Sequence, residues 1–121
     1  MYGKKDWFFP DTQLPPAGGD PELFGHESYM VLNPNDVDAT VDMVLYFTDR
    51  DPMKLPPFEV KAGRVICVRA KENEGLLGYD LPVDVQYAVS LHASAPIVAM
   101  YGRLDMRSGP MAFYSHPGYA E

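Results

Sequence analysis

Apolar and polar side chains alternate along much of this sequence, most clearly over residues 39–48. There Val41, Met43, Leu45 and Phe47 fall on one face, and a more polar set of side chains falls on the other. A period of two is typical of a β-strand that turns one face toward a core. The further segments that we predict as strands from the same alternation are 27–32, 85–91 and 97–105.

Turn signals separate these segments. An asparagine- and proline-rich run at 33–36 ends the first of them. Residues 58–61 and 64–69 flank an Ala-Gly pair, and a short glycine-containing connection of this kind predicts a β-hairpin. No segment shows apolar residues at the spacing of three and four that is typical of a helix. We therefore predict an all-β, single-domain antiparallel β-sandwich of about seven or eight short strands.

Proline and glycine divide the chain into three parts. Residues 1–21 are rich in both and are predicted to form an irregular N-terminal arm around one aromatic cluster, at 7–9. Residues 22–107 contain the predicted strands and are expected to form the β-sandwich domain. Residues 108–121 are again interrupted by glycine and proline and are expected to form a C-terminal tail.

Composition and charge limit the possible partners and compartment. With 17 acidic and 10 basic residues, the net charge is -7, which favours solubility and disfavours nucleic acid as a partner. Cys67 is the single cysteine, so no intramolecular disulfide can form, and its apolar neighbours predict a buried, inert thiol. The first residues do not resemble a signal peptide, and no apolar run is long enough to span a membrane. We expect a cytoplasmic protein.

Motifs for catalysis and metal binding are missing from the sequence. His26, His92 and His116 are far apart and lack metal-ligand spacing, so we expect neither a metal nor a cofactor. There is no nucleophile elbow and no glycine-rich phosphate loop. The sequence therefore predicts a binding protein and no enzyme.

Charged side chains on predicted strand faces are the main candidates for recognition. Glu27 shares a face with apolar neighbours and needs a partner if that face is covered. Arg103 and Asp105 share a face with Tyr101, a combination that suits recognition of hydroxyls or carboxylates, although a surface ion pair would look the same. Arg69 ends an apolar strand, from which it either reaches solvent or pairs with an acid.

Several motifs, in order, resemble those of the Anabaena sensory rhodopsin transducer family. The resemblance covers roughly residues 22–107, with a weaker match at Trp7 and at the proline pair 15–16. The matching segments are GHESYMVLN at 25–33, LYFTD at 45–49, VR at 68–69, SAPIV at 94–98 and RLD at 103–105.

The resemblance implies a function that composition does not show. The family fold is a β-sandwich, and its founding member is a soluble cytoplasmic tetramer that associates with a membrane photoreceptor. The wider family resembles small-molecule-binding domains with sugar-like ligands. Asn33 and Asp49 match family positions but precede prolines, so we expect them to form turns. The expected ligand contacts at the remaining family positions are Trp7, His26, Glu27, Tyr46, Arg69, Arg103 and Asp105.

Three functions therefore remain open at this point. The first is a homo-oligomer, expected to be a tetramer, that binds a polar small molecule such as a sugar and signals to a receptor. The second is a pure protein–protein interaction module, in which Val44 and Tyr46 lie at an interface. The third is a sugar-active enzyme that uses Glu27 and Asp105 as a carboxylate pair. For Trp7, a pocket lid, a subunit anchor and simple core packing are all compatible with the sequence.

Overall fold

The computed structural model describes residues 1–107 and 110–121, and strands dominate it. The nine strands of this described part are β1 (Lys4–Gln13), β2 (His26–Asn33), β3 (Ala39–Phe47), β4 (Met53–Lys54), β5 (Phe58–Val60), β6 (Arg64–Ala70), β7 (Gln86–Asp105), β8 (Ala112–Pro117) and β9 (Tyr119–Ala120).

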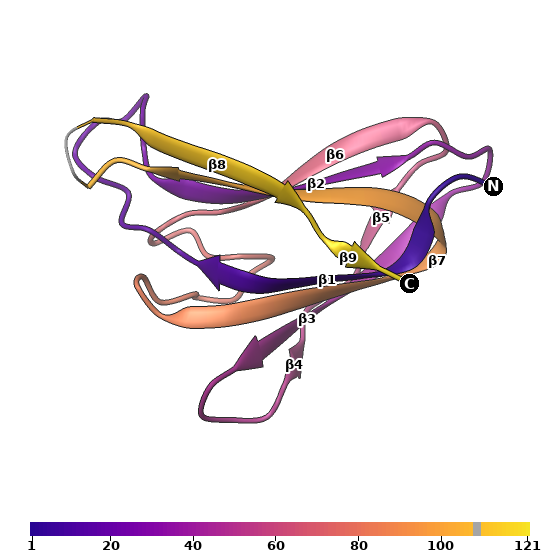
Figure 1. The fold of residues 1–121 in the computed structure, drawn as a ribbon, viewed down its shortest axis with the longest axis horizontal. Coiled ribbons are helices and arrows are strands. Elements are labelled where there is room, and N and C mark those ends of the chain that lie inside the picture. The colour runs from indigo at the N-terminus through magenta and orange to yellow at the C-terminus, as the bar shows by residue number, and fades with distance from the viewer. Residues whose placement is uncertain (108–109) are drawn as a thin grey trace.

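The strands form two layers that share β7. In the first layer, called sheet 1, the order is β4-β3-β7-β1-β9, and β5 also pairs with β3. In the second layer, sheet 2, β2 lies between β6 and the second half of β7, and β8 pairs with the other side of β7. All of these strand pairs are antiparallel, and Figure 1 shows the layers one above the other. The predicted all-β sandwich is confirmed.

Strand β7 corrects the prediction of two separate strands over 85–91 and 97–105. It is one strand of 20 residues that bends and passes from one layer to the other (Figure 1). Ala93 still pairs with β3 of sheet 1, whereas Val98 already pairs with β2 of sheet 2. Pro96, in the corner between them, has no N–H to give to a ladder, which suits a bend where a strand changes sheets.

The N-terminal arm is irregular only in part, so the prediction was wrong for residues 4–13. Residues 4–13 form β1, which pairs with β7 on one side and with β9 on the other. Pro10 lies where the register shifts between Phe9 and Thr12, and a bulge tolerates a residue without an N–H.

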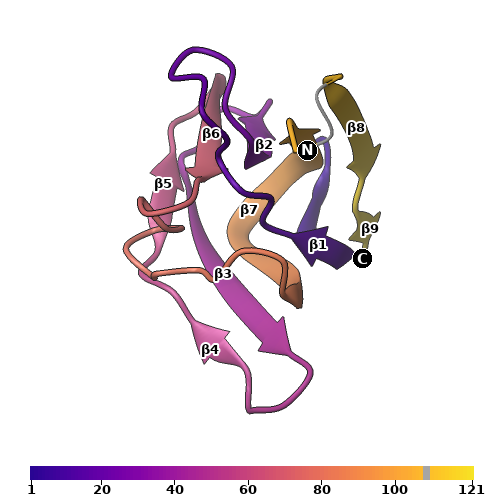
Figure 2. The ribbon, with the colours of Figure 1, turned by 90° about the vertical axis from the view of Figure 1, so that its left-hand side faces the viewer.

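The predicted C-terminal tail also contains strands. Residues 108–109 of that segment lie outside the described residues, and β8 and β9 follow them. β8 pairs in sheet 2 and β9 in sheet 1, so the end of the chain changes layers as β7 does (Figure 2). Gly118 makes this crossing, where a Cβ atom would lie 2.8 Å from the ring of Phe9.

The turn of the predicted hairpin over 58–69 is present, but its two strands do not pair with each other. The turn is present: Gly63 has φ +65°, and the Arg64 amide donates to the Lys61 carbonyl over 3.1 Å. However, β5 pairs with β3 in sheet 1, and β6 pairs with β2 in sheet 2. The turn therefore carries the chain from one layer to the other.

The core lies between the layers and follows the predicted alternation. Val41, Met43 and Leu45 are fully buried, as expected for one face of β3. The prediction for Cys67 was wrong, because its thiol is exposed. Val68 and Ala70 occupy the inward positions of β6, so the alternation places Cys67 on the outer face.

Candidate functional site

The sequence-predicted site residues lie in three places. Glu27 and Arg103 face each other across the β2–β7 ladder, near one end of the sandwich. This end, where β1 finishes and β2 starts, is called the open end below. The residues found at its edge are His26, Arg69 and Asp105. Tyr46 lies instead on the outer face of sheet 1, and Trp7 lies in the core.

Glu27 is an acid at the centre of a buried polar cluster. Its side chain is fully buried, so its oxygens depend on partners within the protein. The Tyr87 hydroxyl donates to one carboxylate oxygen over 2.5 Å. The Tyr101 hydroxyl and the backbone N–H of Gln13, the latter over 3.1 Å, donate to the other oxygen. Glu27 therefore fixes β1, β2 and β7 together, and it does not reach the surface.

Burial governs the pKa values of this cluster. It raises the pKa of Glu27, although the tyrosine hydroxyls, the Gln13 amide and the charge of Arg103 act in the opposite direction. Burial and the nearby carboxylate raise the pKa of Tyr87 and of Tyr101 as well. The hydroxyls therefore stay protonated and keep donating to Glu27.

Replacing Glu27 by Gln is expected to change how stability depends on pH. A carboxyl whose pKa is raised by folding stabilises the folded state below its ordinary pKa of 4.5, and this contribution is lost as pH rises through the raised pKa. The unfolding free energy of the wild type should therefore fall, relative to that of Glu27→Gln, as pH increases through this window. Urea unfolding across the window measures the difference, and parallel curves would contradict the prediction.

Arg103 lies opposite Glu27 in the β2–β7 ladder and keeps unused hydrogen-bonding capacity. Its Nη1 donates to the Gln13 carbonyl over 3.2 Å, and its guanidinium carbon lies 4.8 Å from the centre of the Tyr114 ring. Within the described residues, Nε of Arg103 is the one buried side-chain nitrogen or oxygen atom that has no hydrogen-bond partner. A hydroxyl or carboxylate that entered here would satisfy it.

The other predicted residues of the open end make local contacts. Arg69 is exposed, with its guanidinium carbon 5.5 Å from the centre of the Phe24 ring, so it does not reach Glu27. Nδ1 of His26 lies 2.9 Å from the Phe24 carbonyl. The Asp105 carboxylate accepts from Arg107, at 3.0 Å for the closer oxygen. The structure brings together Glu27 and Arg103, with the remaining three around them.

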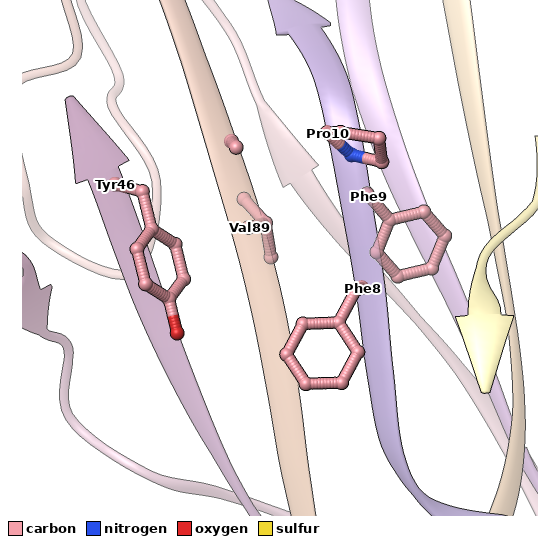
Figure 3. Close-up of a pocket in the computed structure, with 6 residues that line it drawn as sticks. Phe8, Phe9, Pro10, Tyr46 and Val89 are labelled. Atoms are coloured by element: carbon pink, nitrogen blue, oxygen red, sulfur yellow. The ribbon is translucent and has the colours of Figure 1, made fainter. Parts of the chain in front are cut away.

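A groove lies on the outer face of sheet 1, next to Tyr46. Phe8 of β1 and Tyr46 of β3 stand on either side of β7 (Figure 3). Ala88 of β7, which pairs with Tyr46, also lines the groove. This outer groove has a volume of about 240 Å³, and its surface is almost entirely apolar. The remaining residues that line it are Phe9, Pro10 and Val89.

A chain of polar side chains runs from the groove along the same face. The Tyr46 hydroxyl lies 2.8 Å from the Ser90 hydroxyl, which lies 2.8 Å from Nε2 of His92. Nδ1 of His92 then lies 2.7 Å from the Asp6 carboxylate. Serine, histidine and aspartate in this order resemble an activated nucleophile. Here Ser90 is fully buried and bonded to Tyr46, so the chain fixes the tyrosine beside the groove.

Trp7 belongs to the core of the chain, which favours core packing among its three possible roles. Its side chain is 8% exposed. The indole N–H is shared between two backbone carbonyls, Lys4 at 3.0 Å and Ile97 at 3.2 Å. Trp7 therefore holds β1 against the bend of β7.

The sequence did not reveal Phe8, Ser90, His92 or Asp6. They come from β1 and β7, and only the register of this pair shows that Phe8 faces Ser90 and Asp6 faces His92. The one local signal is the spacing of two between Ser90 and His92, which places both on one strand face.

The three histidines lie on different strands, and no group of three potential metal-ligating side chains forms among residues 1–107 and 110–121. In that same part of the chain, no helix has the length and hydropathy needed to cross a membrane.

Comparisons with known proteins agree with the fold. The family model of the Anabaena sensory rhodopsin transducer matches residues 2–120. The solved structure of Thermotoga maritima 1070 is similar with a TM-score of 0.87 and 26% identity, over 100% of this chain and 97% of that chain. The Anabaena sensory rhodopsin transducer itself is similar with a TM-score of 0.73 and 29% identity, over 88% of this chain and 93% of that chain. No curated protein gives a significant match.

Proposed function

The chain belongs to the Anabaena sensory rhodopsin transducer family, and from this membership we propose that it is a non-catalytic signal transducer that binds a receptor protein through the outer groove. The related protein is, by its name, the transducer of a sensory rhodopsin. A membrane photoreceptor is therefore the first receptor to test. We further propose that the chain works in the cytoplasm as a homo-oligomer, with a tetramer as the expected state.

The apolar surface of the outer groove is the observation that carries this proposal. Its volume of about 240 Å³ suits one or two large side chains of a partner. Apolar pockets with aromatic walls are the places where interface hot spots insert their anchors. A sugar would find few partners for its hydroxyls there, so a protein segment with an aromatic or aliphatic side chain is the better occupant.

Tyr46→Glu is expected to weaken receptor binding at least tenfold. The new carboxylate would be desolvated against Phe8 whenever a partner side chain filled the groove. Titration of a purified sensory rhodopsin in lipid nanodiscs measures the affinity. Ala88→Leu, which fills the groove without adding charge, should weaken binding as well. Val85 is exposed and lies outside the groove, so Val85→Glu is the control. Unchanged affinity for both groove variants would contradict the proposal.

A second candidate function is small-molecule binding at the open end. The unpartnered Nε of Arg103 supports it, since a guanidinium edge binds hydroxyls and carboxylates. The buried Glu27 would orient Arg103 without touching the ligand. A thermal-shift screen with sugars, polyols and small carboxylic acids tests this candidate. A stabilising compound should lose its effect in Arg103→Gln, and a hit that is retained in that variant would place the ligand elsewhere.

The sugar-active enzyme receives less support from the geometry. A general acid and a second carboxylate have to flank the bond that they cleave. Glu27 is fully buried, and its carboxylate accepts hydrogen bonds from groups of the protein. Asp105 is paired with Arg107. Neither carboxylate is free to meet a substrate in this arrangement, and we keep the non-catalytic function as our proposal.

A further inference from the structure

The hydrogen-bond chain beside the outer groove has a direction, because each of its links needs one donor and one acceptor. The Tyr46 and Ser90 hydroxyls lie 2.8 Å apart, and the Ser90 hydroxyl lies 2.8 Å from Nε2 of His92. Nδ1 of His92 lies 2.7 Å from the Asp6 carboxylate. A carboxylate only accepts hydrogen bonds, so the proton between these last two groups is on Nδ1. Whether Nε2 also carries a proton then decides the direction of the other two links.

A neutral His92 directs both of these links toward itself. Because its one proton is on Nδ1, the ring can only accept a hydrogen bond at Nε2. Ser90 therefore donates to Nε2, and the Ser90 oxygen accepts from the Tyr46 hydroxyl. In this state the proton of the Tyr46 hydroxyl is used inside the chain, and the Tyr46 oxygen can only accept a hydrogen bond from a partner.

A protonated His92 reverses both links. Nε2 then carries a hydrogen atom and donates to the Ser90 oxygen. Ser90 is fully buried, and within the described residues its hydroxyl has two hydrogen-bond partners, Nε2 of His92 and the Tyr46 hydroxyl. The Ser90 proton therefore goes to the Tyr46 oxygen, and the Tyr46 hydroxyl is left with its own proton to donate to another group.

The surroundings of His92 allow it to gain a proton. Histidine is the side chain that changes charge near neutral pH, and the His92 side chain is 37% exposed, so it exchanges protons with solvent. Asp6 pairs with His92 directly, and the edge of an aromatic ring, that of Phe8, packs 6.0 Å from it. The charged groups on the strands around His92 are Asp6 of β1, Asp42 of β3, Lys54 of β4 and Glu121 beside β9. Acids outnumber bases in this set, so a positive charge on His92 meets more attraction than repulsion.

The Tyr46 hydroxyl is placed to offer its hydrogen bond in the outer groove. Tyr46 lines the groove, and its hydroxyl contacts Ser90, which stands opposite Phe8 in the β1–β7 ladder. The hydroxyl therefore lies at the Phe8 end of the groove (Figure 3). The groove surface is otherwise almost entirely apolar. One hydrogen bond there has a large influence on which partner binds, because a polar group left unpaired in apolar surroundings is costly.

We propose that His92, acting through Ser90, controls which hydrogen bond Tyr46 offers to the partner in the outer groove. With His92 neutral, the groove suits a partner that places a donor there, such as an indole or backbone N–H. With His92 protonated, the groove suits a partner that places an acceptor there, such as a carbonyl oxygen. A change of pH exchanges the two preferences. The inference rests on the proposed receptor site for the identity of the partner, whereas the reversal itself belongs to the isolated chain.

NMR spectroscopy of the isolated chain tests the reversal directly. Nitrogen chemical shifts of the His92 ring report its tautomer and charge. The Cζ shift of Tyr46, assigned by comparison with Tyr46→Phe, reports whether the hydroxyl donates to Ser90 or accepts from it. We expect a neutral His92 with its proton on Nδ1, and a Tyr46 signal that changes with the same midpoint as His92. A Tyr46 signal that stays constant while His92 titrates would overturn the proposal.

Matched variants show whether the signal passes through the chain of hydrogen bonds. Ser90→Ala removes one oxygen atom, so His92 should still titrate while Tyr46 no longer follows it. His92→Gln cannot gain a charge and should abolish the response at a half-exposed position that tolerates substitution. His116→Gln replaces a histidine of sheet 2 and should leave the Tyr46 response unchanged. A full Tyr46 response in Ser90→Ala or in His92→Gln would overturn the proposal.

Receptor titrations below and above the His92 transition separate this inference from the proposed function. The ratio of the two affinities should differ at least about threefold between wild type and Ser90→Ala, and any titration of the receptor itself cancels in that comparison. Measurable binding with equal ratios would overturn the control of the partner by His92. Absence of binding at both pH values, with the Tyr46 response intact, would instead contradict the proposed receptor site and support the reversal.

Discussion

Glu27→Ala is expected to destabilise the protein by about 3–5 kcal/mol, because the substitution removes the acceptor of a buried cluster. The Tyr87 and Tyr101 hydroxyls and the Gln13 amide would lose their common partner. Arg103 would lose the charge opposite it in the ladder, and a cavity would remain. For a domain of this size the melting temperature should fall by more than about 10 °C.

Two control variants show whether the acceptor is responsible. Glu27→Gln keeps one acceptor oxygen and the volume, so it should retain most of the stability. Glu22→Ala removes an exposed acid nearby and should change the unfolding free energy by less than about 0.5 kcal/mol. Urea unfolding at neutral pH gives all three values. A loss of less than about 1 kcal/mol for Glu27→Ala would mean that the cluster is not buried as described.

Trp7→Ala is expected to have an effect of similar size. Truncating a large buried aromatic side chain usually costs about 3–5 kcal/mol. Here it also leaves the Lys4 and Ile97 carbonyls without the indole N–H that they share. Both carbonyls lie where β1 meets the bend of β7, so the loss should loosen the contact between the layers.

The conservative variant separates packing from hydrogen bonding. Trp7→Phe keeps most of the apolar volume and should lose only about 1–2 kcal/mol. Calorimetric or urea unfolding of the three proteins measures the difference. Near wild-type stability for Trp7→Ala would instead mean that Trp7 acts as a surface lid or a subunit anchor.

Alternation located β3, whose outer face is more polar than its inner face, but it did not locate β1. β3 was predicted because inward Val41 and Met43 alternate with polar side chains. β1 was missed because Phe8, on its outer face beside the groove, is as apolar as its buried neighbours Trp7 and Phe9. Pro10 also argued against a strand here, because the sequence does not show that a bulge accommodates the proline.

The same reason explains the wrong prediction for Cys67. β6 has apolar side chains on both faces, so its sequence does not show which of them point inward. The pairing with β2 decides the matter and turns Cys67 outward beside Met30. The failure at β1 falls beside the outer groove that we propose as the receptor site, and binding surfaces are where local rules are expected to fail.

The buried acid was predicted in part. Its position on a half-apolar face showed that Glu27 would need a partner if covered, and the structure covers it. The sequence offered Arg69 as an arginine that could pair with an acid, but Arg103 is the arginine that lies opposite Glu27 in the ladder. The two tyrosine donors were not foreseen, because one of them reaches Glu27 from sheet 1, across the core.

The central claim is that the outer groove, and not the open end, binds the receptor. One titration tests it directly, with wild type, Tyr46→Glu and Arg103→Gln added in parallel to the same sensory rhodopsin in nanodiscs. We expect Tyr46→Glu to weaken binding at least tenfold and Arg103→Gln to stay within about twofold of the wild type, a difference of about 1 kcal/mol or more. Loss of binding in Arg103→Gln, with Tyr46→Glu unaffected, would contradict the claim.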